Sequence, residues 1–190
     1  MLLLILGLIL FLGVHSIAIV DNAWRERMIA RYGENPWKAA YGLLALIGLV
    51  LIVYGYGDAR QTPLLLYTSP AWMRHVTMLL MLPVFPLLFA AYLPGRIQSA
   101  TRHPMLLAVI LWAIAHLLVN GTLADVLLFG GLLAWAVADR VSLARRPQPS
   151  VPGAPPGKYN DVIALGGGLV LYAAFILWLH SLLIGRALIG

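Results

Sequence analysis

Residues 101–121 read TRHPMLLAVILWAIAHLLVNG, an apolar stretch with one histidine at its start and another further along. Ionisable side chains are costly in hydrocarbon, so His116, predicted near the middle of the bilayer, is a functional candidate. A second intramembrane histidine, His15, lies in the first apolar stretch of the chain. Two membrane-buried imidazoles in a chain without cysteine indicate a bound metal or haem sooner than a hydrolase site.

The composition indicates an integral membrane protein. Of the 190 residues, 62% are hydrophobic and only 11% are charged, whereas soluble domains average about 25% charged residues. The absence of cysteine excludes disulfides, thiolate metal sites, c-type haem attachment and iron–sulfur clusters. The net charge is +6, but the basic residues sit at segment ends. This placement is typical of membrane orientation and argues against nucleic acid as a partner.

Six apolar segments predict an all-α, polytopic membrane protein with six transmembrane helices in one bundle. We interpret the first segment as a retained helix, because it lacks the basic start of a signal peptide and its apolar run is too long. Pro83 and Pro86 predict a kink in the third segment. Together the segments form a single domain and cover Leu2–Val20, Trp37–Tyr56, Trp72–Tyr92, Pro104–Val119, Leu123–Ala138 and Val162–Ile184.

The loops predict the orientation. When the N-terminus is placed outside, ten of the thirteen Lys and Arg residues fall in the cytoplasmic connections. Cytoplasmic loops of membrane proteins carry such an excess, so both termini are expected on the outer, periplasmic side of a bacterial inner membrane. The loop Arg140–Asp161 contains five prolines and is expected to be extended. Gly166-Gly167-Gly168 in the last helix predict close helix packing.

The two intramembrane histidines form a candidate ligand pair. Trp112, His116 and Asn120 are spaced to share one helix face. The alternative is that each histidine merely bonds to a neighbouring helix. The helices that carry His15 and His116 enter the membrane from opposite sides. The depths of the two histidines in the bilayer are expected to differ by roughly 10 Å. Two axial imidazoles hold their backbones on the order of 12 Å apart, so the pair is within reach. His75 and His180 remain alternative partners for His116.

The start of the fourth segment is a second candidate. Arg102 and His103 precede Pro104 at a predicted helix N-terminus, where free backbone N–H groups attract anions. They suit a phosphate, a haem propionate or a lipid headgroup, and the alternative is a simple helix-entry signal. Asp125 lies at the start of the fifth helix, where the helix dipole favours an acid. No carboxylate pair or Ser/His/acid arrangement indicates a hydrolase.

Several motifs together resemble the NnrU family: Gly13-Val14-His15-Ser16, Ala40-Tyr41-Gly42, Tyr54-Gly55-Tyr56, residues 101–105, residues 112–117 and Asn120-Gly121. Bacterial NnrU proteins are linked with nitrite and nitric oxide reduction, and the family includes the plastid 15-cis-zeta-carotene isomerase, which carries b-type haem. The resemblance implies haem ligation by His15 and His116. It also implies that the alternative cysteine ligand of the isomerase corresponds to Ala113, so that thiolate exchange is lost here.

The expected function is therefore a b-type haem protein, accessory to nitrogen-oxide respiration (denitrification) through electron transfer, haem handling or sensing. His15 and His116 are the expected axial ligands, with Arg102, His103, Trp112 and Asn120 near the cofactor. One alternative is a haem-dependent cis-trans isomerase of a carotenoid or other polyene lipid. A second alternative is a membrane methyltransferase, because some membrane methyltransferases share the Arg-His-Pro motif. A third alternative is an assembly factor that binds no cofactor. The protein is expected to contact the lipid bilayer. Its further partner would be a polyene lipid substrate or a respiratory membrane protein.

Overall fold

The structure, a computed structural model, describes residues 1–146 and 153–188. Regular structure in these residues is helical, apart from one isolated antiparallel bridge between Leu65 and Thr122, which confirms the all-α prediction. The chain divides into two compact units. Unit 1 comprises Met1–Pro70 and His116–Arg146, and unit 2 comprises Ala71–Ala115 and Pro147–Gly190.

Five helical segments in the described part of the chain are long and apolar enough to cross a membrane, so the protein is an integral membrane protein. The remaining predicted segment forms α7 (Pro104–Leu117), which has only 14 residues. At 1.5 Å per residue it is about 21 Å long, against a hydrocarbon core of about 30 Å. The sixth span therefore stays a prediction. The five segments are α1 (Leu2–Val20), α3 (Glu34–Ala59), α4–α5 (Met73–Ala90), α8 (Leu123–Leu143) and α9–α10 (Asn160–Ile184).

Two short helices fall in regions expected to be loops. The basic connection after α1 forms α2 (Asn22–Tyr32), and α6 (Arg96–Thr101) precedes α7. Asp21 explains the start of α2, because its carboxylate accepts a hydrogen bond from the Trp24 backbone N–H at 2.8 Å. Hydrophobic pattern alone missed α2, since this helix has only 11 residues, many of them polar, and none of its residues is buried.

The expected kink in the third segment is confirmed. Its helix is interrupted at Leu82-Pro83, giving α4 (Met73–Met81) and α5 (Val84–Ala90). Proline lacks the N–H that would continue the ladder, which accounts for the break. A further irregularity was not predicted: α9 (Asn160–Ala174) passes into α10 (His180–Ile184) through a π-helical turn at Phe175–Leu179.

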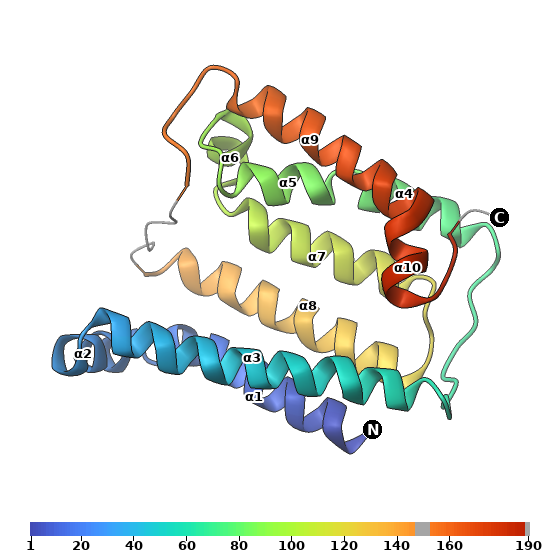
Figure 1. Cartoon of the computed structure of the whole chain (residues 1–190), viewed down its shortest axis with the longest axis horizontal. Coiled ribbons are helices and arrows are strands. Elements are labelled where there is room, and N and C mark those ends of the chain that lie inside the picture. Colours follow the sequence, from blue (N-terminus) through green and yellow to red (C-terminus); the bar gives the residue numbers. More distant parts are fainter. Residues whose placement is uncertain (147–152, 189–190) are drawn as a thin grey trace. The chain divides into compact units, whose positions relative to one another are not determined.

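In unit 1, α1 and α3 cross closely and lie side by side (Figure 1). Glycines form the contact: a Cβ on Gly48 would lie 2.8 Å from the Phe11 backbone nitrogen, and one on Gly55 would overlap the Leu4 backbone. Helix α8 packs on α1, where Gly131 approaches Leu12. Successive contacts from Gly131–Leu12 to Trp135–His15 show that α1 and α8 run parallel.

In unit 2, α9 packs against α5 (Figure 1). A Cβ on Gly168 would overlap Pro86, and one on Gly167 would lie 2.9 Å from the Phe89 ring. The glycine run thus serves close helix packing, as predicted. The predicted Pro-rich loop is shorter than expected, because α8 extends to Leu143 and α9 begins at Asn160. Residues 153–157 carry no helix, while Pro147, Pro149 and Pro152 lie outside the described residues.

Candidate functional site

His15 lies on α1 among three aromatic side chains. Its ring centroid is 4.2 Å from that of Phe11, 5.2 Å from that of Tyr41 and 5.7 Å from that of Trp135. These rings come from α1, α3 and α8, so the histidine sits where three helices of unit 1 converge. The side chain is half-buried. An imidazole in such surroundings is held in one orientation by packing rather than by solvent.

The two nitrogens of His15 have different roles. Nδ1 lies 2.7 Å from the Phe11 carbonyl oxygen. Because a carbonyl can only accept a hydrogen bond, Nδ1 carries the proton and Nε2 keeps its lone pair. Nε2 makes no hydrogen bond within the described residues. Metal-binding histidines typically donate the other ring N–H to a backbone carbonyl in this manner.

A second polar atom near His15 is also unused. The indole nitrogen of Trp135 is buried and has no hydrogen-bond partner among the described residues. Buried donors are nearly always satisfied in folded proteins, so an orphan marks a place where a further group is expected. The Trp135 and His15 rings meet edge-on, with an interplanar angle of 86°. The donor and the free lone pair thus belong to one cluster.

His116 lies in the last turn of α7 and stacks on Phe129 of α8, with ring centroids 4.7 Å apart and planes 24° apart. The expectation that Asn120 shares its helix face is wrong. Helix α7 ends at Leu117, and the Asn120 side-chain amide instead donates to the His116 carbonyl oxygen at 3.0 Å. The backbone N–H of Asn120 also bonds to this carbonyl oxygen, at 2.9 Å, so Asn120 closes the end of the helix.

A buried acid lies on α8 four residues before Phe129, the ring on which His116 stacks. Asp125 is only 5% exposed and accepts the Tyr56 hydroxyl at 2.5 Å, while Tyr56 also contacts Phe129 edge-on. Its other oxygen accepts the backbone N–H and the hydroxyl of Thr122, at 2.9 and 2.6 Å. The capping role was predictable from Thr122 and Asp125, three residues apart. The Tyr56 bond was not, because its partners are 69 residues apart.

The contacts that the two histidines make with α8 show how far apart they lie along the axis of that helix. His15 contacts Trp135 and His116 contacts Phe129, six residues earlier on the same helix. This spacing corresponds to about 9 Å along the axis and about 120° around it. A single metal ion bound by two imidazoles tolerates backbones on the order of 12 Å apart. The level difference of about 9 Å falls within that reach, whereas the rotation of about 120° places the two contacts on different faces of α8.

Arg102 adopts a strained backbone conformation between α6 and α7. Its φ is 60°, the one positive value outside glycine among the described residues. The His103 N–H bonds to the Thr101 carbonyl at 2.7 Å across it, which makes a γ-turn. Such turns are rare and strained, and strained residues gather at functional sites. Arg102 is exposed and His103 half-buried, at the N-terminus of α7 as predicted.

The sequence comparison assigns the family. The model of the family described as NnrU protein matches residues 3–187, nearly the whole chain. The chain belongs to the NnrU family. No curated protein and no solved structure matches it. The match agrees with the resemblance carried by the motifs around His15, Arg102 and His116.

In this NnrU-family protein the six expected cofactor residues divide between the units. His15, His116 and Asn120 belong to unit 1, whereas Arg102, His103 and Trp112 belong to unit 2. Trp112 packs at the edge of a core formed by Val84, Leu87 and Ala108. Helix α7 nevertheless carries both Trp112 and His116 on one face, four residues apart.

The alternative histidines differ from His15 in their surroundings. His75 on α4 is exposed, and its side chain has no polar partner among the described residues. His180 begins α10, and its Nδ1 lies 2.7 Å from the Arg186 carbonyl oxygen. Both belong to unit 2. Their role as alternative ligands stays a prediction.

The NnrU-family protein holds no protein-built metal cluster in its described part. Within residues 1–146 and 153–188, no group of three or more His, Asp or Glu side chains is arranged around a common point. Ala113, where the resemblance places the alternative ligand, is fully buried, and its side chain offers no ligand atom.

Proposed function

We propose that this NnrU-family protein binds b-type haem in a bacterial inner membrane, with His15 and His116 as axial ligands. The observation that carries the proposal is the Nδ1–H bond from His15 to the Phe11 carbonyl, which leaves Nε2 free to coordinate. The orphan indole N–H of Trp135 beside it supports a further group at this place.

The proposal assigns a role to each residue. His15 and His116 hold the iron, and Phe11, Tyr41 and Trp135 fix the orientation of the His15 ring. Arg102 and His103 at the start of α7 would hold a lipid headgroup, separately from the iron site of unit 1. Bound haem would supply one-electron redox chemistry. Since the chain lacks a thiol, we place its role in electron transfer, haem handling or sensing for nitrogen-oxide respiration.

The proposal also includes the topology: six spans, with both termini outside. It rests on the excess of basic residues in the predicted cytoplasmic connections and on the apolar character of α7. Helix α7 is short, and its ends carry polar residues at Arg102, His103 and Asn120.

The visible spectrum of the detergent-purified protein, oxidised and then dithionite-reduced, tests the cofactor. We expect a Soret band and sharp reduced α and β bands, typical of six-coordinate haem b. His15→Ala and His116→Ala should each lose stoichiometric haem, because each removes one axial ligand. His75→Ala is the matched control and should retain the spectrum.

Two results would contradict the assignment. A featureless spectrum after expression with ample haem would remove the cofactor from the proposal. Full haem retention in His15→Ala or in His116→Ala would show that the replaced histidine is not a ligand. If His75→Ala or His180→Ala then loses haem, the missing ligand is a histidine of unit 2.

A further inference from the structure

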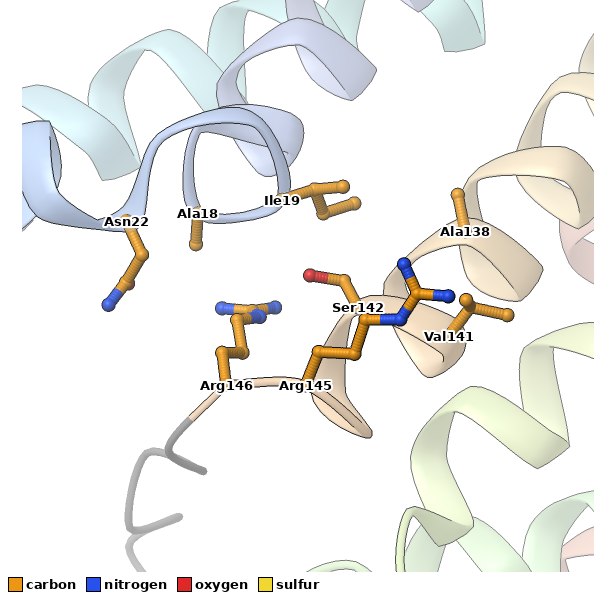
Figure 2. A pocket seen from close by; sticks show the side chains of 8 residues that line it. All are labelled: Ala18, Ile19, Asn22, Ala138, Val141, Ser142, Arg145 and Arg146. Atoms are coloured by element: carbon orange, nitrogen blue, oxygen red, sulfur yellow. The ribbon is translucent and has the colours of Figure 1, made fainter.

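A pocket of about 570 Å³ opens at one end of unit 1. Figure 2 shows it between the end of α1 with the start of α2, and the end of α8. Its wall has an apolar part and a polar part. The eight lining residues are Ala18, Ile19, Asn22, Ala138, Val141, Ser142, Arg145 and Arg146.

The polar part offers hydrogen-bond donors that the protein leaves unused. Arg145 and the Ser142 hydroxyl make no side-chain hydrogen bond or ion pair within the described residues. Arg146 pairs with Asp139 through one terminal nitrogen, but its buried Nε has no partner there. Figure 2 shows the Ser142 hydroxyl and the Arg146 guanidinium on the side of the pocket toward Ala18. The Arg145 guanidinium and the Ser142 hydroxyl suit an oxyanion, while the charge of Arg146 is already paired with Asp139.

The apolar part and the position of the pocket restrict that oxyanion. Ile19 of α1 extends toward Ala138 of α8, and Ala18 and Val141 add apolar surface at the two sides of the pocket (Figure 2). Both helices are membrane-spanning candidates and end here, at Val20 and Leu143. The pocket therefore lies where hydrocarbon gives way to headgroups. A free anion would use the cationic wall but leave the apolar wall facing water.

We propose that this pocket binds the phosphate headgroup of an anionic glycerophospholipid from the adjoining leaflet. Arg145 provides the main contact to the phosphate, and the Ser142 hydroxyl provides a further donor. Ala18, Ile19 and Val141 contact the glycerol backbone and the first methylenes of the acyl chains. This site is separate from the histidine cluster, because His15 is not among its lining residues.

Native mass spectrometry of the full-length protein tests the proposal. Phosphatidylglycerol and phosphatidylcholine are added at equal concentration, and the bound copies are counted. We expect one retained phosphatidylglycerol and about tenfold weaker retention of phosphatidylcholine. Arg145→Gln and Ser142→Ala should each weaken phosphatidylglycerol binding, the former about tenfold. Arg31→Gln removes the same charge from the exposed end of α2, outside the pocket, and should bind like the wild type.

Arg146 is left unchanged in this test, because its removal would strand the partly buried carboxylate of Asp139. Equal retention of the two lipids, or unchanged binding in Arg145→Gln, would overturn the proposal. A third arm adds millimolar inorganic phosphate to the lipid-bound protein. Failure of phosphate to displace the lipid supports a headgroup site, whereas displacement that depends on Arg145 would show a free-anion site instead.

Discussion

At the scale of single residues, His15 and His116 were recognisable because an imidazole inside an apolar run is conspicuous. The surroundings of these residues were not recognisable. Trp135 and Tyr41 are brought to His15 by helices 120 and 26 residues away along the chain. Tyr56 reaches Asp125 in the same way. Sequence spacing describes neighbours on one helix, and these partners come from different helices.

Arg102 provides the first prediction at this scale. Its positive φ is unfavourable for any residue with a Cβ but not for glycine. Arg102→Gly should therefore be more stable than Arg102→Ala by about 1–2 kcal/mol, since both lose the guanidinium and only one relieves the strain. Thermal unfolding of both variants in the same detergent, followed by tryptophan fluorescence, measures this difference. Equal midpoints would mean that the γ-turn carries no strain.

At the scale of the elements, hydrophobic pattern located the apolar helices well. The limits of α1 agree at both ends, and the kink at Pro83 follows from proline chemistry. Pattern failed for α2, a short helix rich in polar residues, and for the end of α7, where Asn120 closes the helix three residues after Leu117. Hydropathy identifies long segments suited to lipid, so a short helix of mixed composition escapes it.

The close crossing of α1 and α3 gives a prediction for one residue with a matched control. A Cβ on Gly55 would overlap the Leu4 backbone, whereas one on Gly57 meets nothing within 4 Å. Gly55→Ala should destabilise by about 1–3 kcal/mol, because the helices must separate. Gly57→Ala should be neutral or stabilising by up to about 1 kcal/mol, since alanine favours a helix. Thermal unfolding in detergent compares them, and equal loss in both would argue against the close crossing.

At the scale of the whole molecule, the sequence predicted the class and the family but not the division into two units. That division depends on which helices pack together, and the glycine contacts of α1 with α3 and of α5 with α9 decide it. The number of spans also depends on α7, whose apolar composition favours a crossing while its length does not.

The cysteine-free chain allows a direct test of topology, because each introduced cysteine is a unique label site. With six spans and an outside N-terminus, a membrane-impermeant maleimide applied to intact spheroplasts should label Gln61→Cys but not Ala30→Cys or Ala154→Cys. All three residues are exposed. Labelling of Ala154→Cys together with Gln61→Cys would mean that α7 does not cross, since every later segment would then change sides.

The shortness of α7 has a consequence for the lipid around it. If α7 crosses, its helical part falls about 9 Å short of the usual hydrocarbon thickness, and the bilayer must thin locally or admit water at its ends. We therefore expect higher thermal stability in bilayers with 14-carbon acyl chains than in bilayers with 20-carbon chains. Unfolding midpoints in nanodiscs of both lipids measure this, and independence of chain length would contradict it. If stability does depend on chain length, the acyl-chain length of the surrounding lipid regulates this protein. The effect would act through α7, which begins with Pro104 and has His116 in its last turn.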